Sequence, residues 1–447
     1  MQGIKPHRSP DFSLPLRYMA AGVVSFVVAA TAIPLVAPAF LRTYDDPHVF
    51  ALVHLIVLGW ITMVMMGALH QLLPVALQGE IRKPGVGKWN FWVYAAGVAG
   101  FVPSFYAWWP PGIAIFGTLT VGGVIHFGVN IGRSFRTVPV WNAMAYYLVC
   151  GLGWLTVTIS FGFVYALDEA FNWFDVTPSM LAAHVHVGLA GWCGLTLMGV
   201  SYKLVPLFAQ VRNDDERIAR GNLALWNLGL VGLVASLIFA PGTPIVPSFA
   251  GMLDLSAAIF VFDMLRILRR RRQKSVSLEQ WHTLISFGSL LLAAGMGTVL
   301  ATGHQPTRTW VVTYGYAALI GCFGFAIAGK YYKIIPFLRW FHRYGRTPPT
   351  GRVPLLKDML DERLGYASLV TLFAGYLTTL AGILEDSLLA ARIGGGIFAV
   401  GSYLLVIAIA RVFGEKSSTR REFEEGRLLL SPELEERRRR RTGRETS

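Results

Sequence analysis

The sequence predicts an all-α polytopic membrane protein of about twelve transmembrane helices. Three observations support this fold class. Of the 447 residues, 54% are hydrophobic and only 15% are charged, whereas soluble domains carry about 25% charged residues. Apolar stretches of roughly 20 residues, the length that a helix needs to cross a bilayer, recur along the whole chain. A glycine-rich motif also appears three times at nearly equal spacing.

Twelve apolar stretches fit transmembrane helices, and short polar connections separate them. Their boundaries are set to within about two to four residues. The stretches are residues 18–41, 49–76, 90–108, 112–132, 139–166, 178–208, 221–240, 246–268, 281–302, 309–338, 363–383 and 390–412. We therefore predict one membrane domain over residues 1–413, followed by a charged cytoplasmic tail over residues 414–447.

The repeated motif lies in the second, sixth and tenth predicted helices. Its copies are HLIVLGWITMVMMGALHQLLP at 54–74, HVGLAGWCGLTLMGVSYKLVP at 186–206 and YAALIGCFGFAIAGKYYKIIP at 316–336. The two motif glycines are eight residues apart and share one helix face, which allows close packing in lipid. Because a fixed period defines architecture, we predict three pseudo-repeats of four helices. Their ranges are about 15–136, 137–274 and 275–413.

The net charge of +14 is distributed in a way that sets a topology. Lys and Arg gather in alternate connections, whereas the other connections hold few basic residues. By the positive-inside rule, this places both termini in the cytoplasm of a bacterial-type inner (plasma) membrane. The basic runs fit contacts to anionic membrane lipid, and no nucleic-acid partner is expected because nothing in them reads bases.

The first motif position carries chemistry that packing does not explain. It is His54, His186 and Tyr316 in the three copies. An ionisable residue inside a span is by default a functional hypothesis, and neutral imidazole is the commonest ligand of metals and of haem iron. We predict that His54 and His186 are axial ligands of a b-type haem iron near the outer face. The alternative is that they only hydrogen-bond to neighbouring helices.

Two further histidines are candidate cofactor ligands. His184 precedes His186 by two residues, so the two side chains point about 200° apart around the helix. Such a pair can serve two cofactors, or one cofactor and one outer-shell partner. The repeat favours His186 as the partner of His54, but the sequence does not decide between His184 and His186. His304, in TGHQP before the tenth helix, is an additional outer-face candidate.

The remaining histidines have simpler interpretations. His48 fits a solvated loop, His70 an aromatic position at the membrane interface, and His126 a hydrogen-bonded packing residue. Three others fall at cytoplasmic helix ends and fit topology charges or surface residues: His7, His282 and His342.

Two aspartates fall in the eighth predicted helix. Asp254 fits either a proton-relay group or a hydrogen bond between helices, whereas Asp263 is expected to pair with nearby arginines. The three cysteines fit buried small hydrophobic residues. The absence of a CxxCH sequence argues against covalently attached haem.

The architecture resembles subunit I of the haem-copper oxidase superfamily, which includes cytochrome c oxidases and nitric oxide reductases. The resemblance covers residues 15–413 and rests on twelve spans, three units and a helix 2 histidine. In that family a helix 2 histidine binds low-spin haem, the role that the resemblance implies for His54. A helix 6 histidine is a copper ligand there, which implies His186 or His184. A more remote membrane family linked to bacterial nitric oxide response shares the twelve spans and histidines.

The chain departs from the oxidase pattern at two places. The copper site of the family needs a His-His pair on helix 7, and residues 221–240 contain no histidine. The helix 10 HxH of the family is replaced by Tyr314 and Tyr316. We therefore expect a divergent member of the superfamily, without copper.

Two functional hypotheses follow. The first is a haem-binding membrane protein that transfers electrons or binds, or responds to, oxygen or nitric oxide. It would receive electrons from a cytochrome c or a quinol, and other membrane subunits are conceivable partners. If it is an enzyme, it is a membrane oxidoreductase of the oxidase or nitric oxide reductase type. The second hypothesis is a transporter or a structural membrane subunit without a redox cofactor, since internal repeats also mark transporters.

Overall fold

The computed structural model describes residues 13–213, 215–273, 275–302, 307–344 and 359–414, and in these ranges it contains helices and no strand. The helices are α1 Ser13–Phe40, α2 Pro47–His54, η2 Leu55–Thr62, α3 Met63–Ala76, α4 Pro84–Tyr106, α5 Pro110–Phe135, α6 Ala143–Phe171, α7 Pro178–His186, η3 Val187–Gly194, α8 Leu195–Ala209, α9 Arg217–Phe239, α10 Ile245–Arg269, α11 Leu278–Ala301, α12 Arg308–Tyr316, η4 Ala317–Gly324, α13 Phe325–Tyr344, α14 Glu362–Leu384 and α15 Leu388–Gly414.

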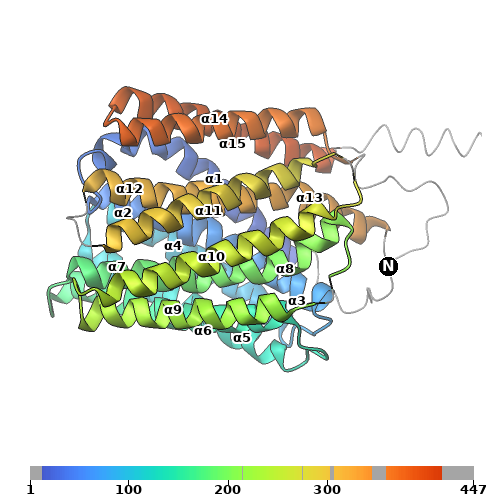
Figure 1. Ribbon diagram of the computed structural model, residues 1–447, viewed down its shortest axis with the longest axis horizontal. Coiled ribbons are helices and arrows are strands. Elements are labelled where there is room, and N and C mark those ends of the chain that lie inside the picture. Colours follow the sequence, from blue (N-terminus) through green and yellow to red (C-terminus); the bar gives the residue numbers. More distant parts are fainter. Residues whose placement is uncertain (1–12, 214, 274, 303–306, 345–358, 415–447) are drawn as a thin grey trace, which may run out of the picture.

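The helices form a multi-pass membrane bundle. Within the described residues, eleven helices are long and apolar enough to cross a bilayer, counting each motif helix once. The 23-residue helix α4 is as long as some of these but less apolar, and it packs against α5. Figure 1 shows the helices running side by side along the long axis of the molecule. The described chain closes on itself, because α1 packs against α15.

Each of the three motif helices contains a π-helical segment of eight residues, at the same place in the motif. These segments are η2, η3 and η4, and each begins directly after the first motif position: His54, His186 or Tyr316. Figure 1 places α2, α7 and α12 toward one end of the bundle, and α3, α8 and α13 toward the other. π-helical turns occur frequently at functional sites. The first motif position lies directly before such a turn in each copy, which makes it a candidate functional position.

The π-helical segments offer backbone carbonyls to side chains of neighbouring helices. The Tyr94 hydroxyl in α4 donates to the Leu58 carbonyl in η2 at 3.0 Å. In the second unit, the Trp226 indole N–H in α9 donates to the Ala190 carbonyl in η3, also at 3.0 Å. Both donors and both acceptors occupy equivalent positions of the repeat, so two of the copies share packing as well as sequence.

The second motif glycine marks the closest approach of each motif helix to the helix that precedes it. A Cβ atom would lie 2.7 Å from Tyr18 at Gly67, 2.6 Å from Tyr147 at Gly199 and 2.5 Å from His282 at Gly329. Any larger residue at these positions would force the helices apart. The sequence predicted that these glycines serve helix packing, and in each copy the glycine packs against one identifiable residue.

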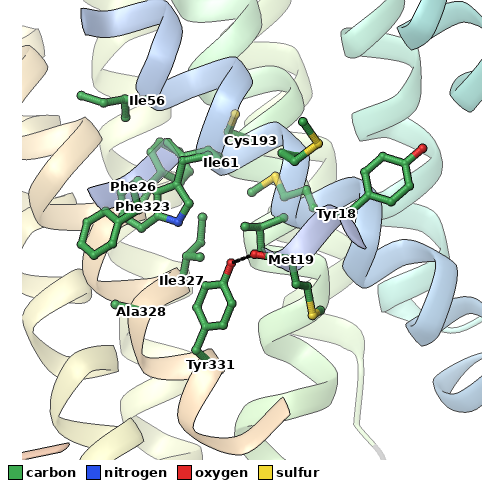
Figure 2. Close-up of a cluster of buried hydrophobic side chains, with 14 of the residues drawn as sticks. Tyr18, Met19, Phe26, Ile56, Ile61, Cys193, Phe323, Ile327, Ala328 and Tyr331 are labelled. Atoms are coloured by element: carbon green, nitrogen blue, oxygen red, sulfur yellow. Dashed lines mark hydrogen bonds between the residues drawn. The ribbon is translucent and has the colours of Figure 1, made fainter. Parts of the chain in front are cut away.

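The three motif helices meet in the interior of the bundle. Figure 2 shows this core, in which Ile61, Cys193 and Phe323 from the three motif helices gather with Phe26 of α1. The Tyr331 hydroxyl donates to the Met19 carbonyl at 2.9 Å and ties α13 to α1. Cys193 and Cys322 are buried, as the sequence predicted, whereas Cys150 is half-buried; none of the three forms a disulfide.

Three histidines outside the candidate site lie in surroundings that differ from those predicted from the sequence. His70 is buried rather than at an interface, and its ring stacks on Tyr18 at 5.4 Å. His282 is fully buried rather than on the surface, because Gly329 leaves room for it. His126 is exposed on the outside of the bundle rather than packed. These differences arise because the partner across a helix contact cannot be read from one helix alone.

Candidate functional site

One large cavity lies beside the π-helical segments. Its volume is about 900 Å³, and side chains of α2, α7 and α12 contribute to its lining together with those of the helices packed on them. The walls are largely apolar, with a few polar groups that include the predicted histidines. This composition and a volume of a few hundred to a thousand Å³ are typical of small-molecule and cofactor sites.

His54 lies in this cavity with one ring nitrogen engaged and the other available. Its Nδ1 lies 2.8 Å from the Phe50 carbonyl, so Nδ1 carries the proton and donates it. Nε2 is therefore the unprotonated nitrogen, which is the form that binds a metal. Phe105 stacks on the imidazole, with ring centroids 4.7 Å apart, and Phe101 meets it edge-on at 5.3 Å.

His184 lines the same cavity as His54. The two are linked through α6, because Ala166 of α6 is buried in one cluster with Phe101 and Phe105, the rings that contact His54. The His184 ring packs edge-on to Tyr165 of α6 at 5.7 Å, and a Cβ on Gly162 would lie 3.2 Å from its Cε1 atom. Its Nδ1 atom is buried and has no hydrogen-bond partner. We call His54, His184, Phe101, Phe105 and Tyr165 the His54 cluster.

His186 has partners on both ring nitrogens. Nδ1 donates to the Ala182 carbonyl at 2.7 Å, and Nε2 accepts the Tyr314 hydroxyl at 3.1 Å. The two rings are nearly parallel, with centroids 6.0 Å apart. His184 and His186 thus have different neighbours: His184 packs against α6, and His186 packs against α12. The sequence left open which of the two is a ligand.

Asp254 extends the polar surface around His186. It is half-buried in α10, lines the cavity and accepts a hydrogen bond from the Thr298 hydroxyl of α11. Tyr314 lies close by, because Gly297 precedes Thr298 and a Cβ added there would lie 3.3 Å from the Tyr314 ring. No ion pair to Asp254 is present among the described residues, in contrast to Asp263, which pairs with Arg266 at 2.8 Å as predicted. We call His186, Tyr314, Asp254 and Thr298 the Asp254 cluster.

The connection before α2 carries a separate polar group. Asp46 caps α2 through the His48 backbone N–H, and its carboxylate also contacts the His48 imidazole at 2.7 Å and the Arg42 guanidinium. Burial raises the pKa of the Asp46 carboxyl, but these hydrogen bonds and charges outweigh burial, so its pKa lies below the ordinary value. His48 is thus tied to a helix cap and does not line the cavity.

The fourth candidate ligand, His304, lies outside the described residues, as do His7 and the predicted tail from residue 415 onward. In the part of the chain that the structure describes, no three His, Cys, Asp or Glu side chains gather in a group able to hold a bare metal ion. A haem iron needs only one or two protein ligands, because the porphyrin supplies the others.

Several residues of the site were not anticipated from the sequence. Phe101, Phe105, Tyr165 and Gly162 come from helices that carry no motif, and only their three-dimensional contacts reveal them. Tyr314 did have a signal, because it occupies the position of the third motif copy that His184 occupies in the second. No known family model matches this chain, and no curated protein is significantly similar to it in sequence.

Proposed function

We propose that this chain is a haem-binding integral membrane protein, in which the imidazoles of His54 and His184 would hold a b-type haem. The observation that supports this most strongly is the fixed tautomer of His54. Nδ1–H donates to the Phe50 carbonyl, which leaves an unprotonated Nε2 inside an apolar cavity that His184 also lines. A hydrogen bond to the second ring nitrogen is the usual outer-shell support of a ligating histidine.

The donor set fits a haem in its chemistry. Neutral imidazoles in apolar surroundings are suited to iron, and Phe105 and Phe101 pack against His54, one stacked and one edge-on. The hydrogen bonding of His184 is less complete than that of His54, because no acceptor contacts its Nδ1. When bound, the haem would supply one-electron chemistry, and oxygen or nitric oxide could reach the iron only where one of the two histidines gives way. The residues of the chain orient it and exclude water.

The wider proposal is a divergent relative of haem-copper oxidase subunit I, with three units of four helices. The repeated contacts at the motif glycines and the shared π-helical segments support a common unit. Copper is not part of the proposal, since α9 carries no histidine. Any catalytic activity would be that of a membrane oxidoreductase of the oxidase or nitric oxide reductase type, in a bacterial-type inner membrane with both termini cytoplasmic.

A second candidate function is membrane transport, and Asp254 is the observation in its favour. Asp254 is an acidic residue inside a span, lines the cavity and has no ion-pair partner among the described residues. Such residues often mark substrate or proton pathways. Uptake of a substrate by vesicles containing the His54→Ala/His184→Ala variant would favour this alternative.

The test is the absorption spectrum of the purified protein from haem-replete cells. We expect a Soret band and a pyridine haemochrome spectrum of b-type haem at about one haem per chain, both lost in His54→Ala. His48→Ala is the matched control, because His48 lies nearby but outside the cavity, and it should keep the full spectrum. Protein without a Soret band, or a His54→Ala variant with the full band, would contradict the proposal.

A further inference from the structure

The charges that line the large cavity are of one sign. Its Asp and Glu lining residues are Asp45, Glu169 and Asp254. Among the described residues no Lys or Arg lines it, although the chain contains 40 of them and has a net charge of +14. Asp45 lies before α2 and Glu169 in the last turn of α6, and both are exposed, whereas Asp254 is half-buried. The cavity therefore attracts cations rather than anions.

Asp254 is the carboxyl group of this lining that lies inside a span. Such a group is costly in a membrane unless it is paired or protonated. The Thr298 hydroxyl donates to it, and no cation pairs with it among the described residues. His186 is engaged elsewhere, through the Ala182 carbonyl and the Tyr314 hydroxyl. Without a ligand the carboxyl can hold a proton, and a bound cation takes the place of that proton.

The space beside Asp254 suits an organic cation better than a bare metal ion. The described residues contain no group of three His, Cys, Asp or Glu side chains able to hold such an ion. Around Asp254 the cavity of about 900 Å³ is lined by apolar side chains of α10 and α11, among them Leu253, Ala257, Ala293 and Leu300. A cation that fills this space needs an apolar body, as ligands of largely apolar pockets do.

An ammonium head group matches the remaining hydrogen-bonding capacity of Asp254. The carboxylate has about four lone-pair directions, and Thr298 occupies one of them. A primary ammonium brings three N–H donors. If a neutral amine meets the protonated carboxyl, the proton moves from oxygen to nitrogen, and the products are a carboxylate and an ammonium. The net charge inside the membrane is then unchanged, and the two groups form a charge-assisted hydrogen bond.

We propose that Asp254 is the counter-ion of a lipophilic amine, which binds in this cavity as its ammonium form. The ammonium donates to the Asp254 carboxylate, and the hydrocarbon body contacts the apolar residues of α10 and α11. The amine site does not involve the His54 cluster, so this inference goes beyond the proposed function and does not depend on it.

The experiment compares three probes of one shape and different charge: adamantylamine, adamantanol and adamantane carboxylate. Isothermal titration calorimetry measures their binding to the purified protein in a non-ionic detergent at neutral pH, with protein-free micelles as the blank. We expect the amine to bind at least about tenfold more tightly than the alcohol, since a hydrogen bond to a charged group is worth about that factor. The carboxylate probe should bind more weakly than either. Asp254→Asn keeps the size and an acceptor for Thr298, and it should abolish most of the amine preference.

The matched control is Asp263→Asn, which changes a carboxylate of the same helix that is paired with Arg266 and does not line the cavity. It should keep the wild-type affinities. Equal binding of amine and alcohol by the wild type would overturn the proposal, as would a full amine preference in Asp254→Asn. If Asp254→Asn fails to fold, the smaller neutral variant Asp254→Ser replaces it, with the same loss expected. Protein with a b-haem spectrum but no amine preference overturns the amine site alone.

Discussion

The His54 cluster and the Asp254 cluster lie in the same cavity and share one short helix, yet their chemistry differs. His184 and His186 are two residues apart in α7, so they face opposite sides of it. In the His54 cluster an imidazole nitrogen is left bare, whereas in the Asp254 cluster both nitrogens of His186 are engaged. His54 and His186 both donate Nδ1–H to a backbone carbonyl, so the difference lies at Nε2, which accepts the Tyr314 hydroxyl in His186 and faces the apolar cavity in His54.

The repeat explains how this difference arises. At the position two residues before the first motif residue, the three copies have Leu52, His184 and Tyr314. The tyrosine of the third copy satisfies His186 of the second, so His186 is not a bare nitrogen. No tyrosine hydroxyl donates to His54 among the described residues; its ring contacts the α4 residues Phe101 and Phe105, and its Nδ1 donates to the Phe50 carbonyl. The asymmetry between copies thus separates one candidate metal ligand from one hydrogen-bonded histidine.

The largest effect on stability is expected from breaking a buried ion pair. Asp254 has no such ion pair among the described residues. Lys330 pairs with Glu279, whose side chain is 2% exposed, and Thr283 also donates to this carboxylate. Lys330→Met leaves the charge buried without a cation and should lower the unfolding free energy by about 3–5 kcal/mol. Thermal unfolding in detergent measures this loss, and the double variant Lys330→Met/Glu279→Leu should recover most of it.

Lys333→Met is the control, three residues further along the same helix, and should change the free energy of unfolding by less than about 0.5 kcal/mol. Asp254→Asn, which removes an unpaired carboxylate, should cost only about 1 kcal/mol, the value of one hydrogen bond. The contrast between paired and unpaired carboxylates breaks down if Lys330→Met is as stable as the wild type.

A smaller effect is expected when the glycine that lies beside each cluster is replaced by alanine. An added Cβ would lie 3.2 Å from His184 at Gly162 and 3.3 Å from Tyr314 at Gly297. Gly162→Ala should shift the Soret band and weaken haem binding by a factor of about five, as expected for a crowding cost of about 1 kcal/mol. Gly297→Ala should leave the haem spectrum unchanged. Gly153→Ala, with open space around it, controls for helix propensity.

The smallest effect concerns pH. Because the folded-state pKa of Asp46 is depressed, its contribution to stability is present above the unfolded pKa of about 3.9 and is lost as the pH falls through the folded pKa. Asp46→Asn keeps a good N-cap residue and removes the charge. Between pH 6 and pH 3 the wild type should therefore lose slightly more thermal stability than Asp46→Asn. Equal losses would show that the Asp46 charge contributes nothing.

The sequence predicted the helical membrane class and the Asp263–Arg266 pair, because hydropathy and charge act locally along the chain. It did not predict the π-helical segments, which insert extra residues into a turn without changing composition and so rotate the helix faces beyond them. It also did not reveal Phe105, Tyr165 and Gly162, since they meet the histidines from distant helices. The different neighbours of His184 and His186 therefore could not be predicted from the sequence.

The most direct test of the central claim is the haem-to-protein ratio in His184→Ala and His186→Ala, purified side by side with the wild type. If the His54 cluster holds the haem, His184→Ala should lose most of the haem or change its Soret band to that of a single-histidine site. His186→Ala should keep the wild-type ratio and spectrum. The reverse pattern, with haem lost from His186→Ala and retained in His184→Ala, would contradict the assignment of the two faces of α7.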